Sequence, residues 1–457
     1  MKKFLLISYH DSLPLNERKL LEGADIHTFT PFPGAVAYLV SRLHEYHIEA
    51  DYLVIGNDYH ETIDKITGKY EFVGISTTFT ASIDLIRSIC LSIKNKMECK
   101  VIIGGPYIAA KIKESSHAAR NHILGFCKAD IYINSFHGED TLVDILKGAR
   151  GDYASIGNIF YKMKESQYNF TFEEADETDL EQTIYWNLFE NSCGEYVNVR
   201  TCISCPYSCA YCAFPAYAGT YMERSLESLF HELDLIESMK RVKVIHFIDD
   251  TFNVNRKRFR EILERIVQKK YTFKWHGYIR AQLLDEEIVR FMAESGCLGV
   301  LLGVESGSQR MLDEMNKKAQ IEDIVQKHRL LQKYNITTIA SFFVGFPTET
   351  KESVEDTLRV IDEMKPDFYE IRPWFYNRNT PVYERREQYG LAGSGACYSH
   401  KTMSSQEAGK WCDWIIQNVK GSVLKNMTDY TLFMLLAGGT DLDTIKRMVE
   451  AFNEKRS

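Results

Sequence analysis

Short apolar runs alternate with helical patterns along most of this 457-residue chain, and this alternation limits its fold more than any other feature. In the first 150 residues, five runs rich in β-branched residues are separated by stretches with apolar residues at helical spacing. The runs are FLLISY from Phe4, DYLVIG from Asp51, FVGIST from Phe72, KVIIGG from Lys100 and DIYINS from Asp130. Strands that are apolar on both faces, with helices between them, form parallel sheets covered on both sides. The sequence therefore predicts a doubly wound, Rossmann-like α/β domain over residues 1–150, with ligands beyond the carboxyl ends of its strands.

A second alternation begins at Tyr196 and predicts a second domain. Its six apolar runs are YVNVR, VIHFIDD, TFKWHGY, GVLLGV, TIASFFVG and DFYEIR. Six β/α units predict an incomplete parallel barrel over residues 191–385, with functional groups on the loops after the strands. Residues 151–190 are polar and acidic with little periodicity, so we expect a connector there. Gly393 and Gly395 break the pattern, and the three helical stretches that follow predict a small helical domain over residues 386–457.

Composition excludes several classes of protein. There are 55 Lys and Arg residues against 63 Asp and Glu residues, a net charge of −8, so no overall positive charge favours nucleic acid or an anionic membrane. No apolar run approaches the roughly 18 residues of a membrane span, and MKKFLLISYHD is typical of a first strand rather than a signal peptide. Eleven cysteines without a secretory signal indicate metal or redox use in a reducing compartment. We therefore expect a cytoplasmic protein with no nucleic-acid or membrane partner.

Four of these cysteines lie within eleven residues, in the segment TCISCPYSCAYCAFPAYAG that follows the run YVNVR. Cys205, Cys209 and Cys212 have the spacing C-x3-C-x2-C. Closely spaced thiolates on a loop hold iron–sulfur clusters, and three ligands on a four-iron cluster leave one iron open to a substrate group. A structural zinc site is the alternative, with Cys202 as its fourth ligand. Only three residues would separate the two cysteine pairs, fewer than in zinc ribbons, so the spacing favours the cluster.

The cysteine motif and four later segments resemble the radical S-adenosylmethionine (SAM) superfamily. The motif has an aromatic residue, Tyr211, before its last cysteine and follows the first strand of the β/α pattern. The later segments each follow one of the next four predicted strands. They are FIDDTF (Phe247 to Phe252), WHGYIR (ending in Arg280), GVESGS (Gly303 to Ser308) and GFPTET (Gly345 to Thr350). Members of this superfamily reductively cleave SAM at a 4Fe-4S cluster and release a 5′-deoxyadenosyl radical.

The resemblance implies a role for each candidate residue in the barrel. Cys205, Cys209 and Cys212 would bind the cluster, and Tyr211 would pack near the adenine. Asp249 or Asp250 would accept hydrogen bonds from the methionine amino group, and Arg280 would balance the methionine carboxylate. Glu305 and Ser306 would bind the ribose hydroxyls. The structural alternatives are a helix N-cap for the aspartates, solvent exposure for Glu305 and an ordinary ion pair for Arg280. Cys202 matches no family role and is expected to be a bystander thiol, the alternative being a place at the edge of the cluster or a catalytic part.

The first domain resembles the cobalamin-binding domain of one subgroup of this superfamily. Ser76, Thr77 and Thr78 close the third predicted strand, and Gly104 and Gly105 close the fourth. They resemble a Ser-x-Leu and Gly-Gly pattern that binds the nucleotide tail of cobalamin, with Thr78 in place of Leu. Small residues there let the corrinoid approach the backbone.

A further part of the resemblance lies in FHGEDT, which supplies Glu139 after the fifth strand, where the subgroup carries a Gly-Glu signature. The motif that supplies a cobalt-ligating histidine is incomplete, because Asp25 and His27 are followed by Thr30 instead of Gly. The alternative is a nucleotide-type domain used only for packing or substrate docking.

These resemblances imply a cobalamin-dependent radical SAM methyltransferase that acts on an unactivated carbon or on phosphorus. The substrate would be a small molecule or a peptide of natural-product biosynthesis, and the electron donor a flavodoxin- or ferredoxin-like protein. A non-methylating C–H functionalisation, rearrangement or ring closure, with or without cobalamin, is the alternative, and a non-catalytic iron–sulfur or corrinoid carrier is a third. Tyr376 and Tyr383 would line the substrate pocket or pack in the core. The remaining seven cysteines are scattered, which argues against an auxiliary cluster and against a methylthiotransferase.

Overall fold

The computed structural model describes residues 4–10, 32–80, 82–148, 153–164, 167–174 and 179–454. The Asp25 to Thr30 motif lies outside the described residues. The described chain divides into two compact units, each presented here by itself. The first contains strand β1, Phe32–Cys193 and Phe230–Ile236, and the second contains Gly194–Leu229 and the chain from Glu237 onward.

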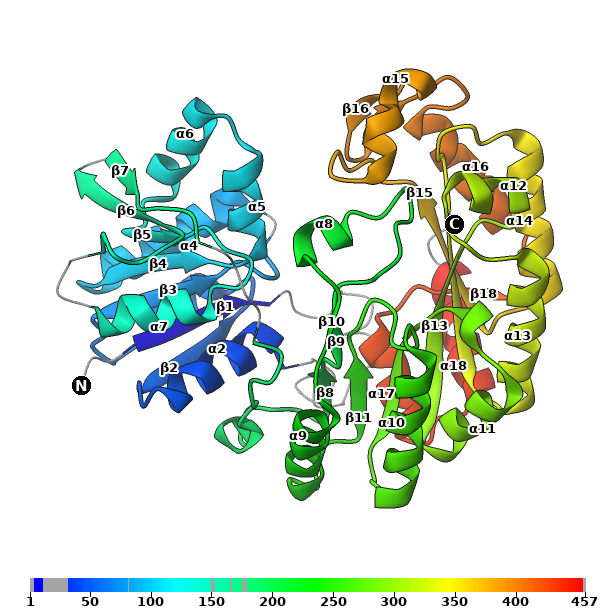
Figure 1. Cartoon of the computed structure of the whole chain (residues 1–457), viewed down its shortest axis with the longest axis horizontal. Helices are drawn as coiled ribbons and strands as arrows, with labels where there is room; N and C mark the ends of the chain where they lie inside the picture. Colours follow the sequence, from blue (N-terminus) through cyan, green and yellow to red (C-terminus); the bar gives the residue numbers. More distant parts are fainter. Residues whose placement is uncertain are drawn as a thin grey trace. The chain divides into compact units, whose positions relative to one another are not determined.

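The first unit is built on a parallel sheet with the strand order β2-β1-β3-β4-β5. The strands are β1 (Phe4–Tyr9), β2 (Ala50–Ile55), β3 (Phe72–Ser76), β4 (Lys100–Gly104) and β5 (Ile131–Ile133). Helix α2 packs beside α7 on one face, and α4 packs beside α3 and α6 on the other (Figure 1). The helices are α2 (Gly34–Glu45), α3 (Tyr59–Asp64), α4 (Ile83–Lys96), α5 (Pro106–Glu114), α6 (His117–Cys127) and α7 (Glu139–Lys147). This is the predicted doubly wound fold, with a core cluster of mostly aliphatic side chains from the sheet and from α3, α4, α5 and α6.

Two antiparallel strands extend this sheet inside the stretch predicted as an aperiodic connector. Strand β6 (Ile159–Lys164) pairs with β5, and β7 (Gln167–Phe170) pairs with β6. The rings of Phe160 and Phe170 lie 4.6 Å apart and cover the sheet edge. Because the hairpin buries only one short face and ends in lysines, its apolar pattern is too brief to stand out in the sequence.

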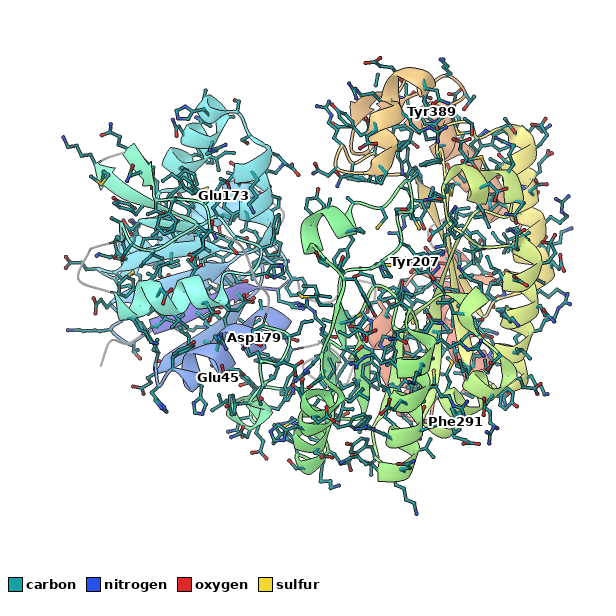
Figure 2. All side chains as sticks on the ribbon, viewed as in Figure 1. Glu45, Glu173, Asp179, Tyr207, Phe291 and Tyr389 are labelled. Carbon is teal, nitrogen blue, oxygen red and sulfur yellow. The ribbon has the colours of Figure 1, made fainter. Side chains whose placement is uncertain are left out.

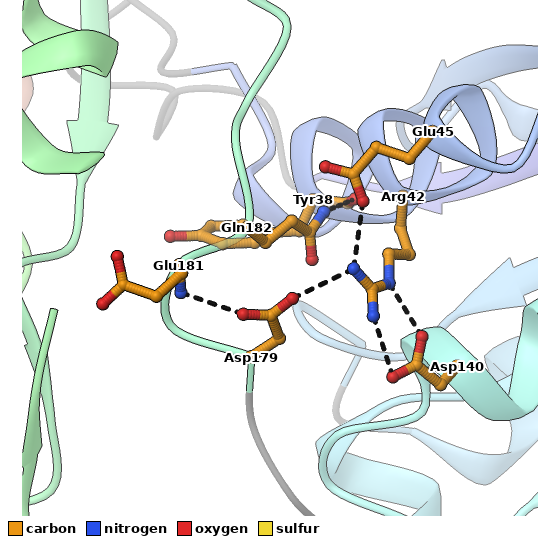
Figure 3. A network of polar contacts seen from close by, with 7 residues as sticks. All are labelled: Tyr38, Arg42, Glu45, Asp140, Asp179, Glu181 and Gln182. Carbon is orange, nitrogen blue, oxygen red and sulfur yellow. Dashed lines mark hydrogen bonds and ion pairs between the residues drawn. The ribbon is translucent and has the colours of Figure 1, made fainter. Parts of the chain in front are cut away.

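Arg42 of α2 holds the segment after this hairpin against the first unit (Figure 3). Its guanidinium donates two hydrogen bonds to Asp140 at the start of α7, at 2.7 and 3.0 Å, and one each to Glu45 and Asp179, both at 3.0 Å. Gln182 donates to a backbone carbonyl of α2 at 2.7 Å. The hydrogen bonds and charge of Asp140 raise the pKa of Arg42 further above its ordinary value. One buried guanidinium therefore joins two helices and the connector.

The second unit contains a parallel sheet with the order β8-β11-β12-β13-β14-β15, extended by the short β18. The strands are β8 (Tyr196–Val199), β11 (Val244–Phe247), β12 (Lys274–Ile279), β13 (Cys297–Glu305), β14 (Thr337–Val344), β15 (Phe368–Pro373) and β18 (Val423–Leu424). Its outer helices include α10 (Arg256–Lys269), α11 (Glu286–Glu294), α12 (Gln309–Glu314), α13 (Ile321–Lys333) and α14 (Lys351–Met364). The residues of α9 (Leu226–Ser238) are divided between the two units. The six predicted β/α units are present in the predicted order, and Figure 1 shows the helices along the outside of the sheet.

The C-terminal segment forms the three expected helices, α16 (Ser405–Asn418), α17 (Asp429–Ala437) and α18 (Leu442–Glu454), after a hairpin of β16 (Ala392–Ser394) and β17 (Cys397–Ser399). These elements belong to the same compact unit as the barrel. Helix α17 packs into the barrel, where the Phe433 ring stacks on His276 with centroids 3.9 Å apart. A Cβ atom on Gly299 would meet this ring at 2.7 Å, so the glycine makes room for it. Within the described ranges, no helix is both long and apolar enough to span a bilayer.

Candidate active site

A buried carboxylate holds the start of the cysteine loop. Asp249, which follows β11, accepts hydrogen bonds from the backbone N–H groups of Thr201 and Cys202 at 2.8 and 2.9 Å, and from the Thr201 hydroxyl at 2.7 Å. Burial raises the pKa of Asp249, and the three donated hydrogen bonds oppose that rise. Both carboxylate oxygens are therefore used by the loop, and Asp249 is only 2% exposed.

The three motif cysteines line one cavity of about 490 Å³ in the second unit. Cys205, Cys209 and Cys212 lie at its edge together with Tyr207, which is labelled in Figure 2. Desolvation raises the pKa of the Cys212 thiol to about 11. No three His, Cys, Asp or Glu side chains of the described residues converge on one point as ligands of a single metal ion would. The loop therefore presents three separate thiols to one enclosed space.

Asp250, the neighbour of Asp249, lines the cavity. Desolvation and the adjacent Asp249 carboxylate raise the pKa of Asp250 to about 7. Thr251 also lines the cavity, and its hydroxyl lies 3.7 Å from the Cys205 sulfur. Of the two aspartates that the sequence offered for one role, only Asp250 presents its side chain to the cavity.

Arg280 follows β12 and is held in place by the loop around it. Its guanidinium stacks over the Tyr207 ring at 3.7 Å, donates to the Lys317 carbonyl and lies 3.8 Å from the Cys209 sulfur. The Asn253 side chain accepts a hydrogen bond from the backbone N–H of Arg280 and donates one to its backbone carbonyl, both at 2.9 Å. The Nε atom is buried without a hydrogen-bond partner. Arg280 thus carries a positive charge to the cysteine loop and keeps one donor for a ligand.

Glu305 forms a buried polar triad with Lys317 and Tyr211 at the other side of the cavity. The Lys317 ammonium donates to Glu305 Oε1 at 2.8 Å and to the Tyr211 hydroxyl at 3.0 Å, and Tyr211 donates to the same carboxylate oxygen at 3.0 Å. Glu305 has φ = 71°, a left-handed conformation at the end of β13 that turns its side chain toward the cavity. A Cβ on Gly303 would lie 2.6 Å from the Glu305 carboxylate, so a larger residue there would displace that carboxylate.

Several predicted residues lie away from this cavity. Ser306 is fully buried, and its hydroxyl accepts from the Ser308 N–H at 3.2 Å and contacts Thr357. Tyr376, also buried, and Tyr383 pack in an aromatic cluster behind the loop, which is the packing alternative given above. Cys202 lies in the short strand β9 (Cys202–Ile203), and burial and the Asp249 charge raise the pKa of its thiol. Ser306 is therefore misplaced for a ribose contact, and Cys202 does not line the cavity.

The predicted cobalamin contacts meet at the carboxyl edge of the first unit's sheet. Strands β3 and β4 pair, so Ser76 lies opposite Gly104. The Thr77 hydroxyl donates to the Gly104 carbonyl at 2.9 Å and accepts from a helix N–H at 3.2 Å. Gly105 has φ = 109°, and a Cβ there would lie 3.0 Å from the Thr77 nitrogen. Thr77 thus holds the carboxyl ends of β3 and β4 together, and Gly105, which has no side chain, leaves the backbone there open to a ligand.

Thr78, which is exposed, shares a 3.1 Å hydrogen bond with Ser76, and Glu139 is the first residue of α7. Three buried polar atoms in strands or loops of this unit have no hydrogen-bond partner: Ser8 Oγ, Thr80 Oγ1 and Asn134 Oδ1. Buried polar atoms are normally satisfied, so unsatisfied ones beside an accessible edge favour a ligand or ordered water. The donor and acceptor set fits a polar cofactor tail.

A family model described as the radical SAM superfamily matches residues 200–361, which include the cysteine loop and the strands that carry Asp250, Arg280 and Glu305. Residues 200–361 are a radical SAM domain. The chain is therefore a radical SAM enzyme.

Three relatives extend this comparison. The radical SAM chain is 26% identical over 349 residues to an uncharacterized methyltransferase of Pyrococcus horikoshii, covering 74% of each protein. It is 26% identical over 277 residues to an anaerobic magnesium-protoporphyrin IX monomethyl ester cyclase of Cereibacter sphaeroides, covering 55% of this chain and 44% of the cyclase. The fold is shared with the radical SAM methyltransferase TsrM of Kitasatospora setae, solved with cobalamin and a 4Fe-4S cluster. That match has a TM-score of 0.67 and 17% identity, and covers 85% of this chain and 75% of TsrM.

The sequence did not single out the remaining polar residues of the cavity. They are Thr251, Tyr278, Lys317, Ser341, Glu370, Arg372 and Asp429. Four of these residues could have been found from the sequence, because Tyr278, Ser341, Glu370 and Arg372 are polar positions within otherwise apolar strands. No sequence pattern pointed to Lys317 or Asp429, since only the folded chain brings them to the barrel.

Proposed function

We propose that this enzyme is a cobalamin-dependent radical SAM methyltransferase that acts on an unactivated carbon of a small molecule or peptide. The observation that carries the proposal is the convergence of Cys205, Cys209 and Cys212 with Asp250 and Arg280 on one cavity. The similarity to a methyltransferase over 74% of the chain supports methyl transfer, and the TsrM-like fold supports cobalamin in the first unit. When bound, the cluster would supply an electron to the SAM sulfonium, and cobalamin would carry the methyl group.

The chain's own residues divide the remaining work. The three thiolates would bind the cluster, and the Arg280 guanidinium would bind the methionine carboxylate. Asp250 would accept from the amino group, while Asp249 positions the loop. Glu305 would accept from the ribose hydroxyls, with Lys317 keeping its carboxylate oriented.

In the first unit, Ser76, Thr78 and the backbone at Gly104 and Gly105 would bind the cobalamin tail. Glu139, at the start of α7, would complete that edge.

The test uses the full chain, reconstituted without oxygen with iron, sulfide and hydroxocobalamin, then reduced with dithionite in the presence of SAM. Stoichiometric corrinoid, with S-adenosylhomocysteine formed alongside 5′-deoxyadenosine, supports methyl transfer. 5′-Deoxyadenosine alone would favour the non-methylating alternative, to which the cyclase similarity lends support. Absence of both products contradicts the proposal.

A matched pair of variants tests the cluster ligands. Cys209→Ala removes a thiol that lines the cavity, so we expect loss of the cluster absorbance and of SAM cleavage. Cys202→Ala removes a thiol of the same loop that does not line the cavity, so we expect wild-type iron content. Equal iron loss in both variants would count against the proposed ligand set.

A further inference from the structure

One wall of the cavity carries charged groups that the proposed function leaves unused. Glu370 and Arg372 lie two residues apart on β15 and therefore on the same face of the strand. Asp429, the first residue of α17, and Ser341 of β14 lie beside them along the cavity. Neighbouring Tyr278 of β12 also lines it. This wall lies on different strands from the cysteine loop.

Lys425 lies behind this wall and balances only part of its negative charge. The ammonium, with a side chain only 6% exposed, lies 2.5 Å from both Glu370 Oε1 and Asp429 Oδ1. Burial alone would lower the pKa of Lys425, but the two carboxylates outweigh it and raise the pKa, so the lysine stays charged. Lys425 balances one of the two carboxylates, and among the described residues the only other cation beside them is Arg372, which contacts Glu370 at 3.6 Å. A ligand that draws Arg372 away from Glu370 would leave one negative charge facing the cavity, and such a surface favours a cationic ligand group.

Arg372 provides a weakly paired positive charge next to that surface. Its side chain is 69% exposed, and its only described ion pair is a 3.6 Å contact with Glu370. The other two cations that line the cavity already have roles in the proposed function: Arg280 would bind the methionine carboxylate of SAM, and Lys317 is paired with Glu305. A long, exposed ion pair contributes little, so a ligand carboxylate can replace it at little cost. A guanidinium binds a carboxylate through two parallel hydrogen bonds.

We propose that this wall binds the amino-carboxylate head group of an amino-acid substrate. Glu370 and Asp429 would bind the ammonium, and Arg372 would bind the carboxylate. Ser341 and Tyr278 add hydroxyl groups between the head group and the rest of the cavity. This inference rests on the proposed function, because it takes the cavity as the active site. SAM carries the same kind of head group, so the experiment must distinguish the two ligands.

The experiment measures equilibrium binding to the full chain, reconstituted with iron and sulfide, by calorimetry. The twenty common L-amino acids are tested one at a time, and the tightest is then compared with its N-acetyl derivative, its methyl ester and its decarboxylated amine. We expect each blocked or truncated form to bind at least about tenfold more weakly, equivalent to about 1.4 kcal/mol. If no amino acid binds, or if the methyl ester binds as tightly as the acid, the proposal is overturned.

Variants then assign the contacts. In Arg372→Gln, the acid should bind about tenfold more weakly while the methyl ester is unaffected. This variant should fold, because Arg372 is exposed. Glu370→Gln should reduce the preference for the free amine over its N-acetyl form. Arg329→Gln, an exposed arginine paired with Glu363 on the outer helices, serves as the control and should change nothing.

SAM affinity separates this inference from the proposed function. If Arg372→Gln weakens SAM as much as the amino acid, the wall binds the methionine end of SAM and the inference is wrong. If SAM is bound and cleaved but no amino acid binds, the inference fails while the proposed function stands. If SAM is not cleaved at all, the proposed function itself fails.

Discussion

Replacing Asp249 with alanine should destabilise the protein, whereas the same change at the adjacent Asp250 should not. The change removes the acceptor for three hydrogen bonds and leaves the backbone N–H groups of Thr201 and Cys202 buried without a partner. Each such group costs about 1–3 kcal/mol, so the free energy of unfolding should fall by about 2–6 kcal/mol. For a domain of this size, that loss lowers the unfolding temperature by roughly 10 °C.

The assay is thermal unfolding of the apoprotein, followed by iron content after anaerobic reconstitution. Because Asp249 anchors the start of the cysteine loop, Asp249→Ala should also bind less iron. Asp250→Ala is the matched control, since it removes a carboxylate that faces the cavity instead of the loop. It should unfold within about 2 °C of wild type, load iron normally and bind SAM more weakly. Wild-type unfolding temperature and iron content in Asp249→Ala would refute the reasoning.

Three further predictions concern the two units separately. The pKa of buried His276 lies well below its usual 6.5, so below pH 6.5 the unfolded chain takes up a proton that the folded chain does not, and stability falls by about 1.4 kcal/mol per pH unit. His276→Phe should therefore show a shallower loss of stability in urea unfolding from pH 6.5 to 5, and parallel curves would contradict this. Arg42→Gln should speed limited proteolysis between residues 170 and 190, because Arg42 donates a hydrogen bond to Asp179. Arg265→Gln, which removes an exposed helical ion pair, should not change the cleavage rate. Equal rates in the two variants would argue against a stabilising role of the Arg42–Asp179 contact. Gly105→Ala should weaken hydroxocobalamin binding, measured by equilibrium dialysis, by at least about tenfold, because its positive φ and the nearby Thr77 nitrogen leave no room for a Cβ; unchanged binding would remove this edge from the proposed cofactor site.

The strands and helices with strong periodicity were predictable from the sequence. The six barrel strands are short apolar runs, and α16 and α18 have apolar residues at helical spacing. Helix α17 is apolar around most of its circumference, so its apolar run and not its periodicity made it predictable. The hairpin of β6 and β7 was not predictable, because its aromatic residues Phe160, Tyr168 and Phe170 pack against a sheet edge that only the fold creates.

The sequence predicted the candidate-site residues that directly follow a predicted strand. It did not predict the residues that the fold brings to the site from distant parts of the sequence. Arg280 and Glu305 stand at strand ends and could be selected by position. Asp249 and Asp250 are adjacent and of the same residue type, so the sequence cannot tell their roles apart. Only the structure shows that the Asp249 carboxylate bonds to the cysteine loop and that Asp250 lines the cavity. Ser306 follows Glu305 directly and turns into the core, because successive side chains along a strand point to opposite faces and Glu305 takes the face toward the cavity.

Helix α17 brings the C-terminal part of the chain to the cavity. Phe433 packs on His276 within the barrel, and Asp429 at the first turn of the same helix lines the cavity. A single nine-residue helix, more than 200 residues after the cysteines, thus carries both a ring packed in the barrel and a carboxylate at the cavity wall. Exchanging that helix between homologous enzymes should redirect what they accept while leaving the iron-binding machinery untouched.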